Sequence, residues 1–198
     1  MRIRRTKNLD KILSECDFYY LDDFKGKEIH LEIGMGKGSF IINMAKDNPN
    51  INYVGIEKNE SVLGLAIKKI GLENLSNIRV LGGDVIDNIP LLEGKVTKIY
   101  LNFLDPWPKS RHEKRRLTYI NFLKEYDKLF NGQNEISLKT DNDDFFNYSK
   151  KSLLDYGYEI IEESLDLTNS NIYNIKTEYE EKFIKLGKKI KYIRCIKR

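Results

Sequence analysis

The chain has 198 residues, of which 40% are hydrophobic and 32% charged, and its formal net charge is +4. It contains no apolar stretch of roughly 18 residues and no apolar segment behind its cationic N-terminus, so neither a membrane span nor a signal peptide is expected. We therefore expect a cytoplasmic protein with no membrane partner. A chain of this length buries a sizeable core, and residues 1–198 are expected to form a single domain with a basic N-terminal arm at about residues 1–8.

The two cysteines indicate packing and not metal chemistry. Cys16 and Cys195 lie far apart in the sequence and lack the paired spacing of zinc ligands. In a cytoplasmic protein both are expected to be reduced thiols. The sequence therefore predicts no metal site.

The basic residues are concentrated in three stretches. Residues 1–7, 107–116 and 182–198 hold 4, 5 and 8 lysines and arginines, which is 17 of the 34 in the chain, and their only acid is Glu113. Such segregation favours a polyanionic partner, with nucleic acid preferred. The alternative is that the terminal basic residues serve solubility alone.

The first half of the chain alternates short apolar runs with helical patterns. A short helix from about Leu9 to Glu15 is expected behind Asn8 as its N-cap. Strands are then expected at 28–33, 51–56, 77–81 and 98–103, and helices at 39–47 and from the cap Asn59 to 70. Alternation of this kind predicts an α/β fold with a parallel sheet whose faces are covered by helices.

The second half continues the alternation and then closes it. We expect a helix at about 118–130 closed by Asn131-Gly132, a strand at 135–139, and a helix capped by Asn142 that runs to about 156. A closing pair of strands is expected at 159–161 and 190–196, with an excursion at 169–173 between them.

Glycines and acids follow the expected strands at one edge of the sheet. Ligands bind at the carboxyl ends of parallel strands, where Gly34–Gly38, Glu57, Asp84, Asp105 and Asp141 all fall. The glycines allow close backbone approach to a ligand, and Glu57 is placed to accept ribose hydroxyls. The acids at this edge would repel a pyrophosphate, whereas they suit the sulfonium and ammonium groups of S-adenosylmethionine.

The loop after the fourth expected strand combines a carboxylate with an aromatic ring. Asp105 and Trp107 alternate with Pro106 and Pro108, which stiffen the segment. A basic run follows directly, so the loop is suited to holding a nucleobase beside its phosphates. Stacking of Trp107 on a base and packing of its ring against the core both remain open, as does a plain proline-rich turn with a solvated charge run.

These motifs give the chain a family resemblance. Over nearly its whole length it resembles the bacterial tRNA (guanine-N7)-methyltransferases, through Glu32–Gly38, Asn102–Lys109, Arg111–Arg116, Lys139–Asp141 and Thr177–Glu180. One departure is Leu104, where the family usually has proline. The resemblance implies a Rossmann-like class I methyltransferase fold, with a mostly parallel seven-stranded sheet flanked by helices and an antiparallel closing strand.

The resemblance also implies an activity and a set of site residues. The activity is transfer of methyl from S-adenosylmethionine to N7 of a guanosine in the tRNA variable loop (position 46), by a monomer or homodimer. The implied cofactor contacts are Glu32, Gly34, Gly36, Gly38, Glu57, Asp84 and Asp105, with Asp105 also catalytic. The implied substrate contacts are Lys109, Asp141, Thr177, Glu178, Tyr179 and Glu180. The implied RNA contacts are Arg111, His112, Lys114, Arg115 and Arg116.

Two other functions remain as alternatives. A nucleotide-dependent oxidoreductase would share the glycine loop, but it predicts a Gly-x-Gly-x-x-Gly spacing, and Ser39 occupies the position of the third glycine. A non-catalytic RNA-binding subunit with the same fold predicts the loss of the cofactor acids, and here Glu57, Asp84 and Asp105 are all present.

Overall fold

The computed structural model describes residues 11–12 and 28–198. The expected basic arm at 1–8 lies outside these residues, as does most of the expected helix from Leu9 to Glu15. Among the helices in the described part, none is long and apolar enough to cross a membrane.

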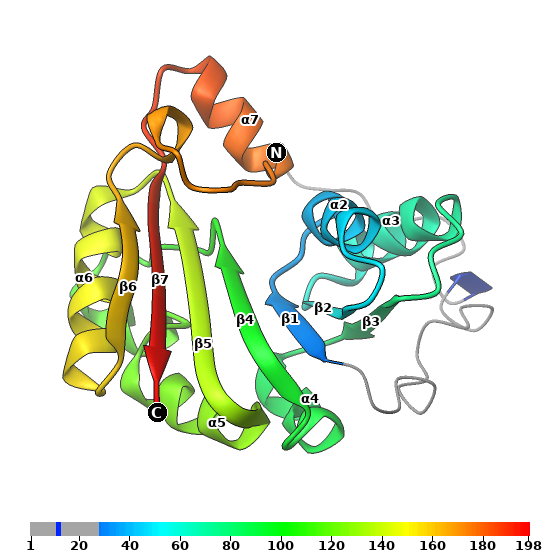
Figure 1. Ribbon diagram of the computed structural model, residues 1–198, viewed down its shortest axis with the longest axis horizontal. Helices are drawn as coiled ribbons and strands as arrows, with labels where there is room; N and C mark the ends of the chain where they lie inside the picture. Colours follow the sequence, from blue (N-terminus) through cyan, green and yellow to red (C-terminus); the bar gives the residue numbers. More distant parts are fainter. Residues whose placement is uncertain (1–10, 13–27) are drawn as a thin grey trace.

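One seven-stranded sheet runs through the molecule in the order β3-β2-β1-β4-β5-β7-β6 (Figure 1). Strands β1 to β5 are parallel, and β7 pairs antiparallel with both β5 and β6. The strands are β1 Ile29–Ile33, β2 Asn52–Glu57, β3 Ile78–Gly82, β4 Val96–Asn102, β5 Phe130–Thr140, β6 Glu159–Ser164 and β7 Lys191–Lys197. The helices are α2 Ser39–Asp47, α3 Glu60–Gly71, α4 Val85–Leu92, α5 Ile120–Leu129, α6 Asp143–Asp155 and α7 Glu178–Lys185, with short 3-10 helices at Ser110–Arg115 and Leu167–Asn169. The expected class I methyltransferase architecture is confirmed.

Alternation along the strands produces two cores, one on each face of the sheet. In β1, Ile29, Leu31 and Ile33 pack with residues of α4, α5 and α6. The second core joins α2 and α3 to the other face through residues such as Tyr53 and Tyr100. His30 lies on that face, where it is 7% exposed and its Nδ1 lies 3.0 Å from the hydroxyl of Tyr100, so it is a packed core residue.

Most element boundaries lie within two residues of those expected, and the caps Asn59 and Asn142 accept backbone hydrogen bonds as predicted. One expectation is wrong: Asn131-Gly132 does not close α5, which ends at Leu129 with Phe130 as its C-cap, and β5 begins earlier than residue 135. Phe130 begins β5, where it is buried and pairs with Val96. Burial of this ring against the sheet outweighs the local signal of a glycine stop.

The strand order creates a crevice at the carboxyl ends of β1 and β4. From β1 the chain proceeds outward through β2 and β3, and it then returns to build β4 and β5 on the other side. Such a reversal leaves the connections after β1 and β4 on opposite faces and opens a ligand site between them. Helix α7 lies over this end of the sheet, and the C-terminus lies at the opposite end (Figure 1).

Candidate active site

A pocket of about 940 Å³ opens at the carboxyl ends of the strands. One part of its lining comes from the loop after β1 and the ends of β2 and β3, and includes Glu32, Gly34–Lys37, Glu57 and Asp84. The other part comes from the loop after β4 and from α7, and includes Phe103–Asp105, Trp107, Lys114, Arg115 and Thr177–Tyr179. The volume is at the upper end for small-molecule sites, so the pocket has room for a cofactor together with part of a second substrate.

The glycine loop turns sharply between β1 and α2. Gly34, Gly36 and Gly38 have φ values of +74°, +59° and +78°, which other residues rarely adopt. A Cβ atom on Gly34 would also lie 3.1 Å from Cδ2 of Leu104. Leu104 is half-buried and packs against the core, so the residue that departs from the family pattern supports the floor of the loop.

Glu57 fixes the glycine loop to the end of β2. Its Oε2 accepts a hydrogen bond from the backbone N–H of Gly36 at 3.0 Å, and its Oε1 accepts one from Asn59 N–H at 2.7 Å. Burial raises the pKa of this carboxyl, partly offset by those backbone donors. A carboxylate has further lone pairs beyond these two bonds, so Glu57 is able to accept ribose hydroxyls while it shapes the loop.

Glu32 is the most buried acid in the lining of the pocket. Its residue is 3% exposed, and Oε1 accepts a hydrogen bond from the side-chain amide of Asn102 at 3.0 Å. Oε2 is buried without a protein partner. Burial raises the pKa of Glu32 to about 8, although the nearby Lys139 opposes the shift. A buried acceptor without a donor is costly, so this atom fits a cationic or N–H donor of a bound ligand.

Asp84 accepts hydrogen bonds from within the protein that the sequence does not indicate. Its Oδ2 accepts from the ammonium of Lys58 at 2.8 Å, and its Oδ1 accepts from Ile86 N–H at 3.2 Å as the N-cap of α4. Burial acts to raise the pKa of Asp84, but the bonds from Lys58 and the backbone lower it below its usual value. Asp84 is therefore ionised, lines the pocket and caps a helix at once.

The Asp105 loop is held in a strained shape by an arginine from the basic run. Phe103 and Trp107 have positive φ values of +50° and +42°, which cost energy in residues other than glycine. Arg116 donates from Nε to the carbonyl of Pro106 and from a terminal nitrogen to that of Trp107, both at 3.1 Å. Arg116, placed by the resemblance among RNA contacts, is thus engaged in holding the loop.

Asp105 itself is exposed at the pocket. Its charge contributes to the raised pKa of Glu57, so the two carboxylates are electrostatic neighbours.

Trp107 both packs the loop and lines the pocket. The guanidinium of Arg115 lies 4.9 Å from the centre of its ring, and His112 contacts the ring edge-on at a centroid distance of 5.6 Å. Lys114 and Arg115 line the pocket. Lys109 and Arg111 are exposed and lie outside its lining, so they are free to contact a larger ligand beyond the mouth.

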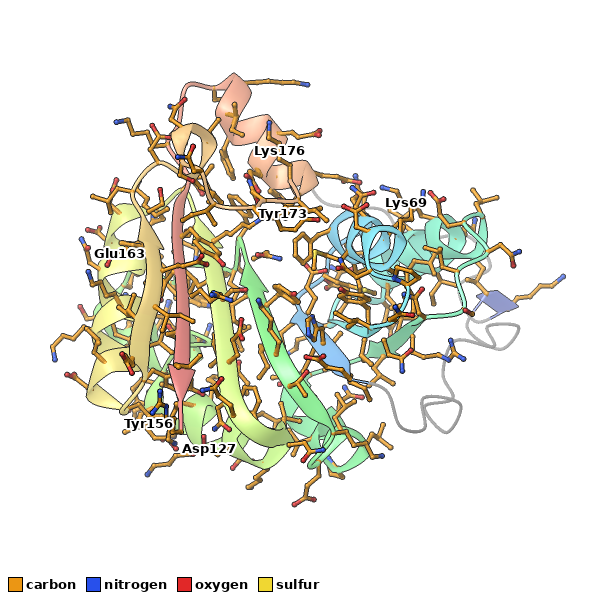
Figure 2. The ribbon with its side chains drawn as sticks, viewed as in Figure 1. Lys69, Asp127, Tyr156, Glu163, Tyr173 and Lys176 are labelled. Atoms are coloured by element: carbon orange, nitrogen blue, oxygen red, sulfur yellow. The ribbon has the colours of Figure 1, made fainter. Side chains whose placement is uncertain are left out.

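A segment from Tyr173 to Glu180, which we name the strap, leads into α7 and crosses toward α2 and α3. Figure 2 shows Tyr173 and Lys176 on it, with Lys69 of α3 beyond. Within the strap, Glu178 accepts hydrogen bonds from Ser39 and from Lys69, the latter at 3.0 Å. The ring of Tyr179 stacks on Phe103 with centroids 6.4 Å apart. The pocket is thereby bordered by residues more than 70 positions apart in the chain.

Of the sequence-predicted substrate residues, Lys109, Asp141 and Glu180 do not line the pocket. Asp141 forms an ion pair with Lys188, and Glu180 is fully buried in an ion pair with Lys139. Tyr179, by contrast, is 55% exposed and lines the pocket.

Sequence reasoning missed the roles of Asn102 and Lys139. Each is a buried polar residue at the end of an apolar strand, and each contacts a buried acid. The available signal was a polar side chain closing an apolar run, because such a residue needs a partner when it is buried. Among the described residues, no three histidine, cysteine or acidic side chains gather as metal ligands.

Comparisons with known proteins agree with this geometry. A family model described as "Putative methyltransferase" matches residues 26–193. The tRNA (guanine-N(7)-)-methyltransferase of Bacillus subtilis is 46% identical over 204 residues, covering 96% of each chain. That of Mycoplasma mobile is 43% identical over 198 residues, covering 98% of each chain.

Solved structures share the fold at low sequence identity. A SAM-dependent methyltransferase from Aquifex aeolicus has a TM-score of 0.60 at 16% identity, covering 96% of this chain and 99% of that chain. An antibiotic-related methyltransferase also has a TM-score of 0.60, at 18% identity, covering 98% of this chain and 95% of that chain. With relatives this similar over almost its whole length, the chain belongs to the tRNA (guanine-N7)-methyltransferase family.

Proposed function

We propose that this protein transfers methyl from S-adenosylmethionine to N7 of a guanosine in the tRNA variable loop (position 46), and that it does so in the cytoplasm. The observation that carries the proposal is that the glycine loop with its acids and the Asp105 loop with its cations border one pocket. The relatives compared above are named tRNA (guanine-N(7)-)-methyltransferases, which supports the reaction class and the substrate.

The cofactor end of the pocket fits S-adenosylmethionine. Glu32 offers an unpartnered buried oxygen to the ammonium group, and Glu57 offers acceptors to the ribose hydroxyls. Val85, Leu117 and Phe122 add apolar lining beside Asp84, where an adenine ring would be held. The cofactor supplies a methyl group already activated as a sulfonium.

The reaction needs no general base from the protein. Guanine N7 carries an exposed lone pair and no proton, so what the chain must do is orient the base for in-line attack. The product base is cationic, and Asp105 at the pocket can accept from the N1–H and N2–H₂ edge while it stabilises this positive charge. Asp141 does not take this role, because it lies outside the pocket lining and forms an ion pair with Lys188.

The RNA side is formed by cations around the mouth of the pocket. Arg111 and Lys114 have no loop carbonyls to hold, in contrast to Arg116, and they are suited to tRNA phosphates. Both residues lie in the 3-10 helix Ser110–Arg115, and Lys109 is exposed at its N-cap. We infer that the phosphate backbone docks here while the base enters the pocket beside Asp105.

The test is mass spectrometry of nucleosides from tRNA incubated with the protein and S-adenosylmethionine, with and without EDTA. We expect 7-methylguanosine to form equally in both, because the proposed chemistry uses no metal. A different methylated nucleoside, or no product, would contradict the proposal. Binding of NAD in place of S-adenosylmethionine would support the oxidoreductase alternative.

A further inference from the structure

A buried lysine at the end of β5 contacts the strap. Lys139 is 5% exposed, and its Nζ donates to the carbonyl of Ile175 at 2.7 Å, to Oε2 of Glu180 at 3.2 Å and to the side-chain oxygen of Asn174. All three acceptors belong to the strap. Every donor of the ammonium is therefore directed to one segment that lies 35 to 41 residues further along the chain.

Glu180 is engaged as completely as Lys139. It is 0% exposed, its second oxygen accepts from the side-chain amide of Asn174, and its backbone N–H is capped by the hydroxyl of Thr177 at 2.9 Å. A charge buried to this degree requires a partner, because removal of one member leaves the other uncompensated. The pair is thus a specific attachment point between the strap and the sheet.

Besides apolar contacts of Ile175 with the core of α2 and α3 and of Tyr179 with Phe103, the other ion pairs and hydrogen bonds that attach the strap are at the surface. Glu178 reaches Lys69 at 3.0 Å and Lys37 at 3.4 Å with side chains 40–52% exposed, and Tyr173 donates to Asp47 at 2.9 Å. Exposed contacts of this kind contribute little, because water screens them and long side chains lose freedom. Between the buried and the exposed attachments lie Thr177 and Tyr179, which line the pocket.

We propose that Lys139 is a positioning residue: its buried ion pair with Glu180 holds the strap on the sheet and so presents Thr177 and Tyr179 to the substrate base. This rests on the proposed function for what the base is, but the attachment of the strap is independent of it. Lys139 does not line the pocket, so it contacts neither cofactor nor guanine and acts through Glu180.

We call the buried ion pair of Lys139 with Glu180, together with the bonds of Asn174 to both, the clamp. The test is a charge-neutral double variant, Lys139→Met with Glu180→Gln, which removes the ion pair without leaving a buried charge alone. The exposed Lys176 within the strap gives a tryptic cleavage site that reports on strap release. We expect cleavage after Lys176 in the native protein to accelerate by on the order of 10-fold or more, with the melting temperature lowered only modestly. At saturating cofactor, kcat/KM for tRNA should fall by a similar factor.

A control ion pair exists on β5, the strand that carries Lys139. Lys98 and Glu135 join β4 to β5 by an ion pair of 2.6 Å with side chains 16% and 21% exposed, and neither lines the pocket. The variant Lys98→Met with Glu135→Gln should leave cleavage after Lys176 and tRNA turnover at the parental values. If the first double variant does not fold, Asn174→Ala removes two bonds of the clamp and should show a smaller increase in cleavage.

Two results would overturn the clamp. One is parental cleavage after Lys176 in the folded double variant or in Asn174→Ala. The other is cleavage at all sites in proportion to lost global stability, with the control pair behaving in the same way. Because proteolysis needs no RNA, a parent protein that cleaves as expected but methylates no tRNA would refute the proposed function and leave the clamp supported.

Discussion

The two ends of the pocket are built by different means. The cofactor end is local: Gly34 to Gly38 form one continuous turn, and Glu57 binds its backbone from the neighbouring strand. The substrate end is assembled from distant parts, since Arg116 holds the Asp105 loop and Lys139 holds the strap. We infer that the site proposed for the cofactor forms together with the sheet, whereas the site proposed for RNA depends on the attachments of Arg116 and Lys139.

The largest expected effect is at Asp105, where the two ends meet. Asp105→Asn keeps the size of the side chain and removes its charge. If the carboxylate stabilises the cationic base as it forms, single-turnover methyl transfer should slow by on the order of 10²-fold or more, with little change in tRNA binding. Thermal melting of the same variant is the control. A lowered melting temperature with a proportionate loss of cofactor and tRNA binding would show that Asp105 merely supports the turn.

The next effect should be confined to the cofactor end. Glu57→Gln removes the charge that accepts from Gly36 N–H and is placed to accept from the ribose. We expect S-adenosylmethionine to bind roughly 10- to 100-fold more weakly, the range for a charged hydrogen bond, with tRNA affinity unchanged. Calorimetric titration with each ligand measures both. A loss of tRNA affinity equal to that for the cofactor would mean that the two ends are not separable.

More of the cofactor end of the pocket than of the substrate end could be predicted from the sequence. The strand ends, the glycine loop and the acids Glu57, Asp84 and Asp105 follow from local patterns, because parallel strands bring successive carboxyl ends to one edge. The contacts of Arg116 and Lys139 could not be predicted, since a basic residue in a polar run or at a strand end does not indicate which carbonyl or acid it will meet. The start of β5, expected at residue 135, was misassigned for the same reason: pairing of Phe130 with Val96, 34 positions away, begins the strand earlier.

A smaller effect should separate the cations that bind RNA from the one that holds the loop. Replacing Arg111 and Lys114 by alanine should weaken tRNA binding and reduce the slope of log affinity against log salt, by up to about one unit per lost phosphate contact. Arg116→Ala should change that slope less and slow methyl transfer more, because it releases the carbonyls of Pro106 and Trp107. Equal slopes for both variants would contradict this division.

A last effect, which depends on titration and not on a lost contact, is a pH dependence of cofactor affinity. With a pKa raised by burial to about 8, Glu32 is protonated in the free protein at neutral pH, and it faces Lys139 and Glu57. Accepting a cofactor ammonium requires the carboxylate, so binding releases a proton. Affinity should then increase between pH 6 and 8, by at most about tenfold per unit. Glu32→Gln should lose this dependence, and an unchanged pH profile in that variant would exclude Glu32 as its source.

The central claim is that guanine N7 attacks the cofactor methyl directly within this pocket. A tRNA carrying 7-deazaguanosine at position 46 tests it, because carbon replaces N7 while the N1–H and N2–H₂ edge proposed to contact Asp105 is kept. We predict that this tRNA binds with the affinity of ordinary tRNA and accepts no methyl group in a single-turnover assay. Methylation of the 7-deaza tRNA at the ordinary rate would contradict the account.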